Sequence, residues 1–262
     1  MLKIGLLGGS GFDDSRLIEN IEQVEVSTPF GLPSDKLTIG NFEGIDLVIL
    51  ARHGKGHTIY PTGVNYRANI WAMKELGVTH IIATTAVGSL REKIAPGHLV
   101  LPDQFIDRTT KRHSTFYEKD TICHIPMAEP FCPKLRGILK ETADSLSLTC
   151  YEKGTVITIE GPRFSTKAES YMFRSWGADI INMSTVPEVV LAREAGICYV
   201  TVAMSTDYDC WHESKEPVTW EMVMKVMGEN VSHVKELFFA SIKRIDFIEC
   251  SCKEAVKASL MS

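Results

Sequence analysis

The sequence predicts an α/β fold, a single domain in which a central twisted sheet, mixed and largely parallel, is flanked by helices. Short apolar runs alternate along the chain with segments of helical period, which is the pattern of strands joined by crossover helices. The 262 residues suffice for one large core, so we expect one domain over residues 1–262. Hydrophobic residues make up 44% and charged residues 23%, as in ordinary globular proteins.

The individual elements follow from these runs. Strands are predicted where Val, Ile and Leu cluster, at Lys3–Leu7, Leu47–Leu50, His80–Thr84, Leu99–Leu101, Gly154–Ile159 and Tyr199–Met204. Helices are predicted over Val64–Leu76, Pro133–Ser145, Thr166–Trp176, Pro187–Glu194 and a long segment from about Thr219 to Ile245. The segment Asp107–Met127 has little periodicity and is expected to be a long excursion or a lid.

Charge and the N-terminal sequence restrict the class of partner. The net charge of −5 argues against a nucleic acid, because phosphate backbones require clustered Lys and Arg. The apolar stretch before the first glycines is too short for a signal sequence or a membrane span. We therefore expect a cytoplasmic protein with a small-molecule partner, no nucleic acid and no membrane.

Seven cysteines are scattered along the chain, at positions 123, 132, 150, 198, 210, 250 and 252. They form no CxxC motif and have no His at zinc-ligand spacing, so no metal site is predicted and most are expected to be reduced structural thiols. Cys250-Ser251-Cys252 is the exception. This pair is expected to form a local disulfide, to act as a redox pair, or to have no function, as is common for cysteines in an exposed tail.

Glycines and a hydroxyl follow directly on the first predicted strand, in Gly8-Gly9-Ser10-Gly11. Glycine lets backbone N–H groups approach an anion, and the hydroxyl of Ser10 adds a donor. The motif lacks the third glycine of a dinucleotide-binding turn and the lysine of a P-loop. It therefore indicates either an oxyanion site or an ordinary turn between a strand and a loop.

Two further strand ends have the same chemical character. Ala51-Arg52-His53-Gly54 follows one apolar strand, and Thr84-Thr85-Ala86-Val87-Gly88-Ser89 follows another. Open α/β sheets bind ligands at the carboxyl ends of their strands, and the planar fork of Arg matches phosphate. Together Ser10, Arg52, His53, Thr85 and nearby backbone amides are predicted to bind one dianion without a metal.

An acidic pair and an aromatic loop complete the candidate site. Asp207 and Asp209 follow the strand Tyr199–Met204, and a protonated carboxyl there could donate to a purine N7 while its neighbour accepts from an exocyclic amine. The alternatives are a calcium-like acidic loop or a helix N-cap. Phe164, in Glu160-Gly161-Pro162-Arg163-Phe164-Ser165, supplies either a face for a flat base or a core side chain.

Taken together, these motifs resemble the methylthioadenosine phosphorylases, within the trimeric class of purine nucleoside phosphorylases. The resemblance is nearly full-length, although the tail after about Ile245 does not match, and residues 246–262 are left poorly assigned. The matching blocks are Gly8-Gly9-Ser10-Gly11, Thr28-Pro29-Phe30-Gly31, Ala51-Arg52-His53-Gly54, Val64-Asn65-Tyr66, Phe105-Ile106-Asp107-Arg108-Thr109-Thr110, His124-Ile125-Pro126-Met127-Ala128-Glu129-Pro130, Glu160-Gly161-Pro162-Arg163-Phe164, Asn182-Met183 and Thr206-Asp207-Tyr208-Asp209-Cys210-Trp211.

The resemblance implies a role for each residue of the site. It places Asp207 as the catalytic acid at the purine N7, with Asp209 at the 6-amino edge. It implies phosphate contacts from Ser10, Arg52, His53, Thr85, Ala86 and Ser184, and contacts to ribose and base from Met183, Phe164, Ser165, Gly88, Asp207 and Asp209. The 5'-methylthio pocket would be lined by His57, Trp220, Val223 and Met224, with His124 supplied by a neighbouring subunit.

The resemblance also implies what the protein does. The expected reaction is phosphorolysis of 5'-methylthioadenosine to adenine and 5-methylthioribose 1-phosphate, a step of purine and methionine salvage. Inorganic phosphate would be the co-substrate, with no cofactor, in a homotrimer with shared active sites. Ser184 stands where relatives often have Thr, and Trp220 and Met224 replace smaller or branched residues in the 5' pocket. The alternatives are a purine nucleoside phosphorylase acting on adenosine, inosine or methylthioinosine, a nucleoside hydrolase, and a non-catalytic nucleoside-binding protein.

Overall fold

Strand β5 (His80–Ser89) lies at the centre of the fold because it pairs with three other strands. It runs parallel to β1 (Lys3–Gly8) and β12 (Cys198–Asp207), and antiparallel to β11 (Ile180–Asn182). Almost every residue of β5 is buried, as expected for a parallel strand covered on both faces. The carboxyl ends of β1, β5 and β12 therefore meet at one edge of the sheet.

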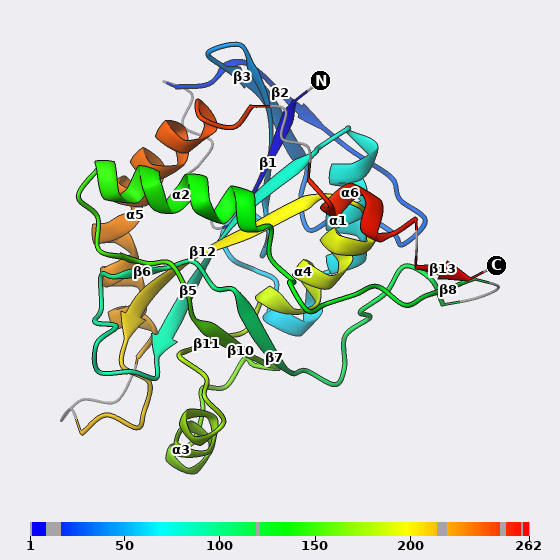
Figure 1. The fold of residues 1–262 in the computed structure, drawn as a ribbon. Helices are drawn as coiled ribbons and strands as arrows, with labels where there is room; N and C mark the ends of the chain where they lie inside the picture. Colours follow the sequence, from blue (N-terminus) through cyan, green and yellow to red (C-terminus); the bar gives the residue numbers. More distant parts are fainter. Residues whose placement is uncertain are drawn as a thin grey trace.

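The computed structural model describes residues 2–8, 17–118, 121–213, 219–246, 250–257 and 259–261. The other strands in these ranges are β2 (Glu19–Val24), β3 (Leu37–Phe42), β4 (Ile45–Ala51), β6 (Leu99–Val100), β7 (Gln104–Arg108), β8 (Ile122–Cys123), β9 (Cys150–Tyr151), β10 (Thr155–Ile159) and β13 (Leu260–Met261). One sheet has the order β2-β3-β4-β1-β5-β11-β10-β7, with β12 beside β5, β6 beside β12 and β9 beside β6 (Figure 1). Strands β8 and β13 pair separately. Parallel pairs outnumber antiparallel pairs, so the predicted mixed, largely parallel sheet is confirmed.

Helices cover both faces of the sheet. The structure assigns η1 (Pro61–Gly63), α1 (Tyr66–Glu75), α2 (Pro133–Ser145), α3 (Lys167–Ser175), α4 (Thr185–Glu194), α5 (Trp220–Ile242) and α6 (Cys252–Ala255). Helices α1 and α4 pack against each other on one side of β12, and α2 and α5 pack against each other on the other side (Figure 1). No helix in the described part of the chain is long and apolar enough to cross a bilayer.

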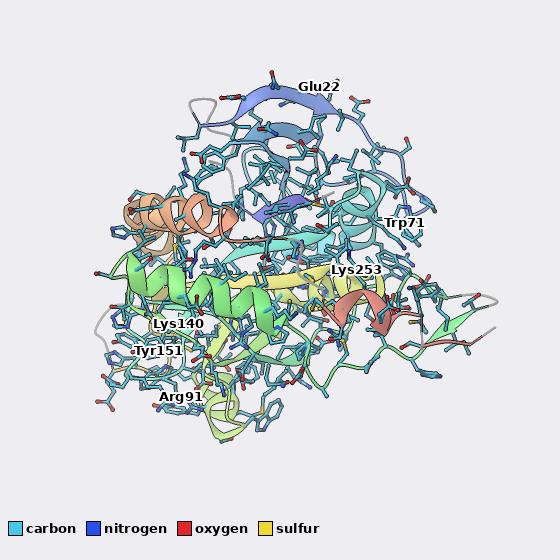
Figure 2. All side chains as sticks on the ribbon, turned by 45° about the horizontal axis from the view of Figure 1, so that its top comes forward. Glu22, Trp71, Arg91, Lys140, Tyr151 and Lys253 are labelled. Carbon is cyan, nitrogen blue, oxygen red and sulfur yellow. The ribbon has the colours of Figure 1, made fainter. Side chains whose placement is uncertain are left out.

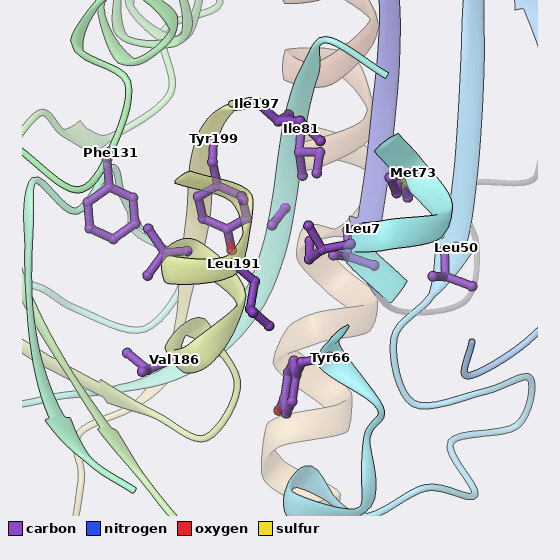
Figure 3. Packing of buried hydrophobic residues seen from close by; sticks show 14 of the residues in the cluster. Leu7, Leu50, Tyr66, Met73, Ile81, Phe131, Val186, Leu191, Ile197 and Tyr199 are labelled. Atoms are coloured by element: carbon purple, nitrogen blue, oxygen red, sulfur yellow. The ribbon is translucent and has the colours of Figure 1, made fainter. Parts of the chain in front are cut away.

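Two hydrophobic cores lie on the two sides of the sheet. Alternate residues of a strand point to opposite faces, so neighbours in sequence enter different cores. Leu7 and Ile81 belong to the core under α1 and α4, part of which is drawn in Figure 3. Leu6 and Ile82 belong to the core under α2 and α5. The central strands are therefore covered on both faces, as their near-continuous apolar sequences predict.

The structure differs from the predicted elements in two respects: two predicted strands run further, and the strands β2, β3, β7, β8, β9, β11 and β13 were not predicted. β5 continues to Ser89 instead of ending at Thr84, and β12 continues to Asp207 instead of ending at Met204. These extensions contain Thr, Ser, Gly and Asp, which lack the apolar signal of a strand. β2 was missed because its residues are almost all exposed and polar; it pairs with β3, and only Val24 at its end packs against the core. Tertiary pairing overrides weak local propensity in all three segments.

Candidate active site

The candidate residues lie where parallel strands end side by side. Ala51, the last residue of β4, is level with Gly8 at the end of β1. Asp207, the last residue of β12, pairs with Gly88 of β5 after a break in register that follows Ser205. The polar strand ends identified from the sequence are thus neighbours in space, as the rule for open α/β sheets predicts.

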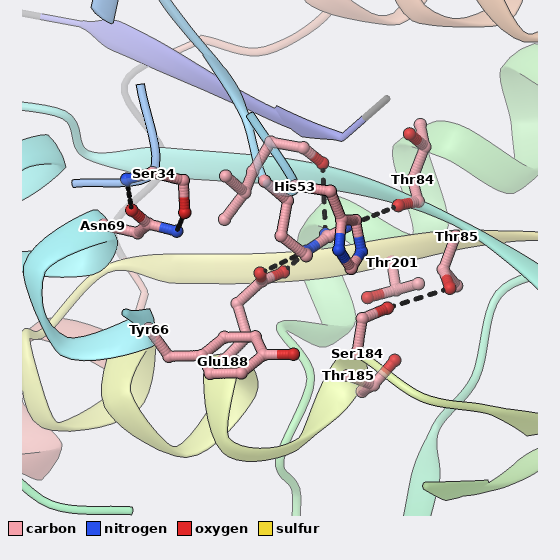
Figure 4. A network of polar contacts seen from close by, with 12 residues as sticks. Ser34, His53, Tyr66, Asn69, Thr84, Thr85, Ser184, Thr185, Glu188 and Thr201 are labelled. Carbon is pink, nitrogen blue, oxygen red and sulfur yellow. Dashed lines mark hydrogen bonds and ion pairs between the residues drawn. The ribbon is translucent and has the colours of Figure 1, made fainter. Parts of the chain in front are cut away.

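Arg52 is buried and its guanidinium is occupied by Glu188. Its Nε and Nη2 donate to the two carboxylate oxygens of Glu188 at 2.6 and 2.8 Å, while Nη1 donates to the Thr84 carbonyl at 2.9 Å and Nη2 to the Leu7 carbonyl at 3.3 Å (Figure 4). The predicted phosphate contact of Arg52 stays a prediction, and most of the fork is already used within the protein. Four of its five N–H groups are used within the protein, so an anion can meet only the remaining Nη1–H.

Glu188 is itself fully buried at the start of α4 and receives a further hydrogen bond. The Tyr199 hydroxyl donates to its Oε1 at 2.6 Å, and the Thr201 hydroxyl donates to Tyr199 at 2.9 Å. Burial and the adjacent carboxylate raise the pKa of Tyr199 well above its ordinary value, so this hydroxyl remains a donor. The network fixes the position of Arg52 before any ligand binds.

His53 is held in one tautomer by the backbone. Its Nδ1 lies 2.8 Å from the Ile59 carbonyl oxygen. A carbonyl can only accept, so Nδ1 carries the proton and Nε2 of the neutral ring is an acceptor. Burial, followed by the charge of Arg52, lowers the pKa of His53 to about 4. A neutral ring with a free acceptor is suited to the P–OH group of hydrogen phosphate.

Two hydroxyls, those of Thr85 and Ser184, meet in the region that Figure 4 draws. Thr85 Oγ1 and Ser184 Oγ are buried and 3.1 Å apart. Ser184 precedes α4 and makes no side-chain cap hydrogen bond, and the regular part of the helix begins only after Val186, whose backbone angles are not helical. Asn182 donates to Thr85 at 3.3 Å and accepts from Thr158 at 2.8 Å, which fixes Thr85. The predicted phosphate contacts Thr85 and Ser184 are therefore brought together.

The acidic pair is buried around Gly88. Asp207 is 7% exposed and Asp209 is 5% exposed. Burial, with a further contribution from the charge of Asp209, raises the pKa of Asp207 to about 6, although Thr206 donates to Asp207 Oδ2 at 2.8 Å. Burial also raises the pKa of Asp209, opposed by the nearby hydroxyls of Ser170 and Ser165 and by the Cys210 backbone N–H. A proton donor and an acceptor thus lie side by side.

The distance along β5 relates the acidic pair to the hydroxyl pair. Thr85 and Gly88 are three residues apart on β5. A strand rises about 3.3 Å per residue, so the two positions are separated by about 10 Å. The antiparallel register of β11 with β5 places Met183 between them, next in sequence to Ser184. This spacing suits a nucleoside with a phosphate at one end and a base at the other.

The loop after β10 lies against the same region. Gly161 has a φ of +66°, and a Cβ there would lie 2.5 Å from the Met183 sulfur, so only glycine allows this approach. The Ser165 carbonyl accepts from the Cys210 thiol at 3.3 Å, next to Asp209. Phe164 is 44% exposed, so the alternative that it is a core side chain is wrong. Its exposed ring is available to a flat ligand.

The predicted 5' pocket is only partly described. The His57 ring lies 4.5 Å from the His53 ring, close to the phosphate end. His124 is exposed on the loop after β8, which lies apart from the ends of β5 and β12 (Figure 1). Ser10 and the side chains of Trp220, Val223 and Met224 lie outside the described residues. Their assigned roles, and that of His124 in a neighbouring subunit, stay predictions.

Two residues near the site were not identified from the sequence, Glu188, which holds Arg52, and Arg112. The Arg112 side chain is 1% exposed and donates to the Val186 carbonyl at 2.6 Å and to the Glu160 carbonyl at 2.9 Å. It joins the loop after β10 to the start of α4. Its own segment, expected to be an excursion or a lid, is thus anchored at Arg112. An isolated arginine in a segment without periodicity carries no local signal of burial.

Gly88→Ala is expected to lower kcat about tenfold, because small misplacements of reacting groups are costly. The new Cβ would lie 3.1 Å from Asp207 Oδ1 and 3.3 Å from the Asp209 Cβ, so both carboxylates must move. Steady-state kinetics would measure this change. Gly137→Ala in α2 is the matched control, since nothing lies within 4 Å of its Cβ, and it should keep the wild-type kcat. Equal rates for both variants would contradict the assigned position of the acidic pair.

The raised pKa of Asp207 predicts a pH dependence of stability. The folded chain holds this proton up to about pH 6, whereas an ordinary carboxyl loses it near 3.8. The contribution of this carboxyl to the free energy of unfolding is therefore fully present at low pH. It is lost as the pH rises from about 3.8 to about 6, and the loss is about 3 kcal/mol at most. Thermal unfolding across this range should show a smaller loss in Asp207→Asn than in the wild type. Parallel profiles for the two chains would show that the carboxyl is not perturbed.

Comparisons with known proteins place this geometry in context. Residues 3–243 match the model of the phosphorylase superfamily. The chain is 57% identical over 249 residues to the S-methyl-5'-thioadenosine phosphorylase of Danio rerio, covering 93% of this chain and 89% of the relative. A variant of the adenosine/methylthioadenosine phosphorylase from Schistosoma mansoni with adenine has a TM-score of 0.94 at 43% identity, covering 100% and 99% of the two chains. Another variant with methylthioadenosine has a TM-score of 0.93 at 42% identity, covering 99% and 98%.

Proposed function

This chain belongs to the S-methyl-5'-thioadenosine phosphorylases of the phosphorylase superfamily, and we propose that it splits 5'-methylthioadenosine with inorganic phosphate. The products are adenine and 5-methylthioribose 1-phosphate. The observation that carries the proposal is the buried acidic pair around Gly88, three residues along β5 from the hydroxyl pair of Thr85 and Ser184. The acidic pair suits a purine base and the hydroxyl pair suits a phosphate ion. The glycosidic bond of a bound nucleoside would therefore lie between the two pairs.

The base end assists departure of the purine. As the bond between N9 and C1' breaks, its electron pair moves to the purine and the ribose gains positive charge. Asp207 is partly protonated near neutral pH because its pKa is about 6, so it can transfer a proton to N7. The buried Asp209 carboxylate can accept a hydrogen bond from the 6-amino group, which favours adenine over a 6-oxopurine.

The phosphate end supplies the nucleophile. Hydrogen phosphate is oriented by the hydroxyls of Thr85 and Ser184 and by the remaining Nη1–H of Arg52. A phosphate oxygen forms a bond to C1', and the negative charge of the phosphate stabilises the cationic sugar. His53 Nε2 accepts from the P–OH group. When the sugar phosphate forms, it loses the P–OH proton. One proton is thus released at the phosphate end for the one that Asp207 transfers to the base, so the reaction is balanced. The proposed reaction uses inorganic phosphate as co-substrate and no organic cofactor.

The second candidate substrate is adenosine. It is supported by the name of the Schistosoma mansoni relative, an adenosine/methylthioadenosine phosphorylase. Initial rates on methylthioadenosine, adenosine, inosine and methylthioinosine, with and without phosphate, would separate the candidates. We expect the highest kcat/KM on methylthioadenosine and no base release without phosphate. Faster inosine cleavage would overturn the substrate, release without phosphate would indicate a hydrolase, and no release at all would indicate a binding protein.

We also propose that the protein is a cytoplasmic homotrimer that acts in purine and methionine salvage. Support for assembly comes from His124, which is exposed and far from the strand ends of its own chain. In a trimer this side chain can complete the 5' pocket of a neighbour. Light scattering would measure the assembly. A fully active monomer would contradict both the trimer and the shared site.

A further inference from the structure

Four cysteines that are far apart in sequence converge on one buried point. The sulfur atoms of Cys132, Cys198, Cys250 and Cys252 all lie within 4.8 Å of one another. Cys132 and Cys250 are 3.6 Å apart, and Cys250 and Cys252 are 3.2 Å apart. Three of the four residues are buried and Cys250 is half-buried. This cluster is absent from the site described above and from the sequence-based expectations, which treated these residues as scattered thiols.

The segments that bring the four thiols together are part of the fold. Cys132 occupies the N-cap position of α2, Cys198 is the first residue of β12, and the other two flank the start of α6. In Figure 1 and in Figure 2, where Lys253 of α6 and Lys140 of α2 are labelled, α6 lies near one end of α2. The CxC pair in the tail is therefore packed against the sheet and is not an exposed tail feature.

We propose that this cluster binds a structural Zn²⁺ ion through four thiolates. Tetrahedral zinc holds sulfur at about 2.3 Å, which places any two sulfurs about 3.8 Å apart. The observed separations of 3.2 and 3.6 Å, with all others below 4.8 Å, need only small adjustments. All four cysteines are free thiols in the structure, so no sulfur of the cluster is already committed to a disulfide.

The surroundings of the cluster suit an anionic thiolate site. Arg193 Nη1 donates to the Cys252 sulfur at 3.6 Å, supplying a positive charge beside it. Cys132 precedes Pro133, the first residue of α2, so it lies at the positive end of a 13-residue helix. Donors around the ligating sulfurs offset the negative charge of four thiolates and fix their orientation. These contacts distinguish the cluster from an ordinary apolar packing of thiols.

The site is structural because four protein ligands leave no open position for a substrate. The cysteine cluster is also far from the acidic pair. Cys198 is the first residue of β12 and Asp207 is the last, so the two are nine residues apart, or about 30 Å along the strand. The ion would join the tail to α2 and β12. The tail then continues to Ser259, whose carbonyl accepts from the His124 backbone N–H at 3.0 Å. Zinc therefore stabilises the segment that carries His124.

Metal analysis of the reduced, full-length protein tests the site directly. We expect one Zn²⁺ per chain, released by a mercurial reagent as the cluster thiols are titrated. Refolding with Co²⁺ in place of Zn²⁺ should give the strong sulfur-to-metal absorption and ligand-field bands of a tetrahedral four-thiolate site. The proposal is overturned if no metal binds when Zn²⁺ or Co²⁺ is supplied to the reduced chain. It is also overturned if the native protein contains disulfides between these cysteines.

Single substitutions separate the cluster from the other thiols. Cys252→Ser and Cys198→Ser should each lower the bound zinc at least tenfold. Cys150→Ser is the matched control, because Cys150 packs against the same hydrophobic core without belonging to the cluster. It should keep one zinc per chain. Equal zinc loss in the control, or full zinc content in both cluster variants, contradicts the assignment. If the cluster variants fail to fold, the Co²⁺ spectrum of the wild-type chain still decides.

Discussion

Asp207→Ala should lower kcat by about 10²- to 10⁴-fold, the usual cost of removing a general acid. The reason is the position of this carboxyl at the end of β12, where burial raises its pKa to about 6 and keeps part of it protonated near neutral pH. Alanine leaves the departing purine without a proton at N7. Because the hydroxyls proposed to bind phosphate lie about 10 Å away from Gly88 along β5, the KM for phosphate should change little.

Two variants make this result specific. Asp207→Asn keeps the size and can donate a hydrogen bond but cannot transfer a proton, so its kcat should lie between those of the wild type and Asp207→Ala. Asp46→Ala is the control, since Asp46 is half-exposed near the opposite end of the parallel strands, level with Lys3. It should keep wild-type kinetics. A near-normal rate in Asp207→Ala would refute the acid role.

Glu188→Ala should destabilise the folded chain by about 3–5 kcal/mol, the cost of leaving a buried charge unpaired. Glu188 is fully buried, and both of its oxygens accept from Arg52 at 2.6 and 2.8 Å. The substitution also removes the acceptor of the Tyr199 hydroxyl. Arg52 then keeps only the Thr84 and Leu7 carbonyls as acceptors and is held less firmly, so we expect a higher KM for phosphate as well. Chemical denaturation and phosphate kinetics would measure the two effects.

A surface ion pair supplies the comparison. Asp144→Ala removes an exposed partner of Lys140 on α2, and such pairs contribute only about 0–1 kcal/mol. The double variant Arg52→Met with Glu188→Leu should recover much of the stability, since apolar residues can replace a buried ion pair. It should not recover phosphate binding. If Glu188→Ala is as stable as Asp144→Ala, the pair does not hold Arg52 in place.

The strand ends were predictable, and the way their side chains are used was not. Apolar runs locate β1, β4, β5 and β12, and the rule for parallel sheets then brings Arg52, Thr85 and Asp207 to one edge. The sequence could not show that the Arg52 fork binds Glu188, because the two residues are 136 positions apart. Nor could it show that β5 runs on to Ser89, since residues 85–89 lack an apolar pattern and are held by pairing with β12 and β11.

By itself, the sequence determined the fold class, the order of the main strands and helices, and the chemical character of the site. These properties are encoded locally, in periodicity and in short motifs at strand ends. The tertiary structure decided which donors remain for an anion, the burial that shifts the pKa of Asp207, and the meeting of Cys132, Cys198, Cys250 and Cys252. Burial and distance depend on which distant segments pack together, and no local pattern records that packing.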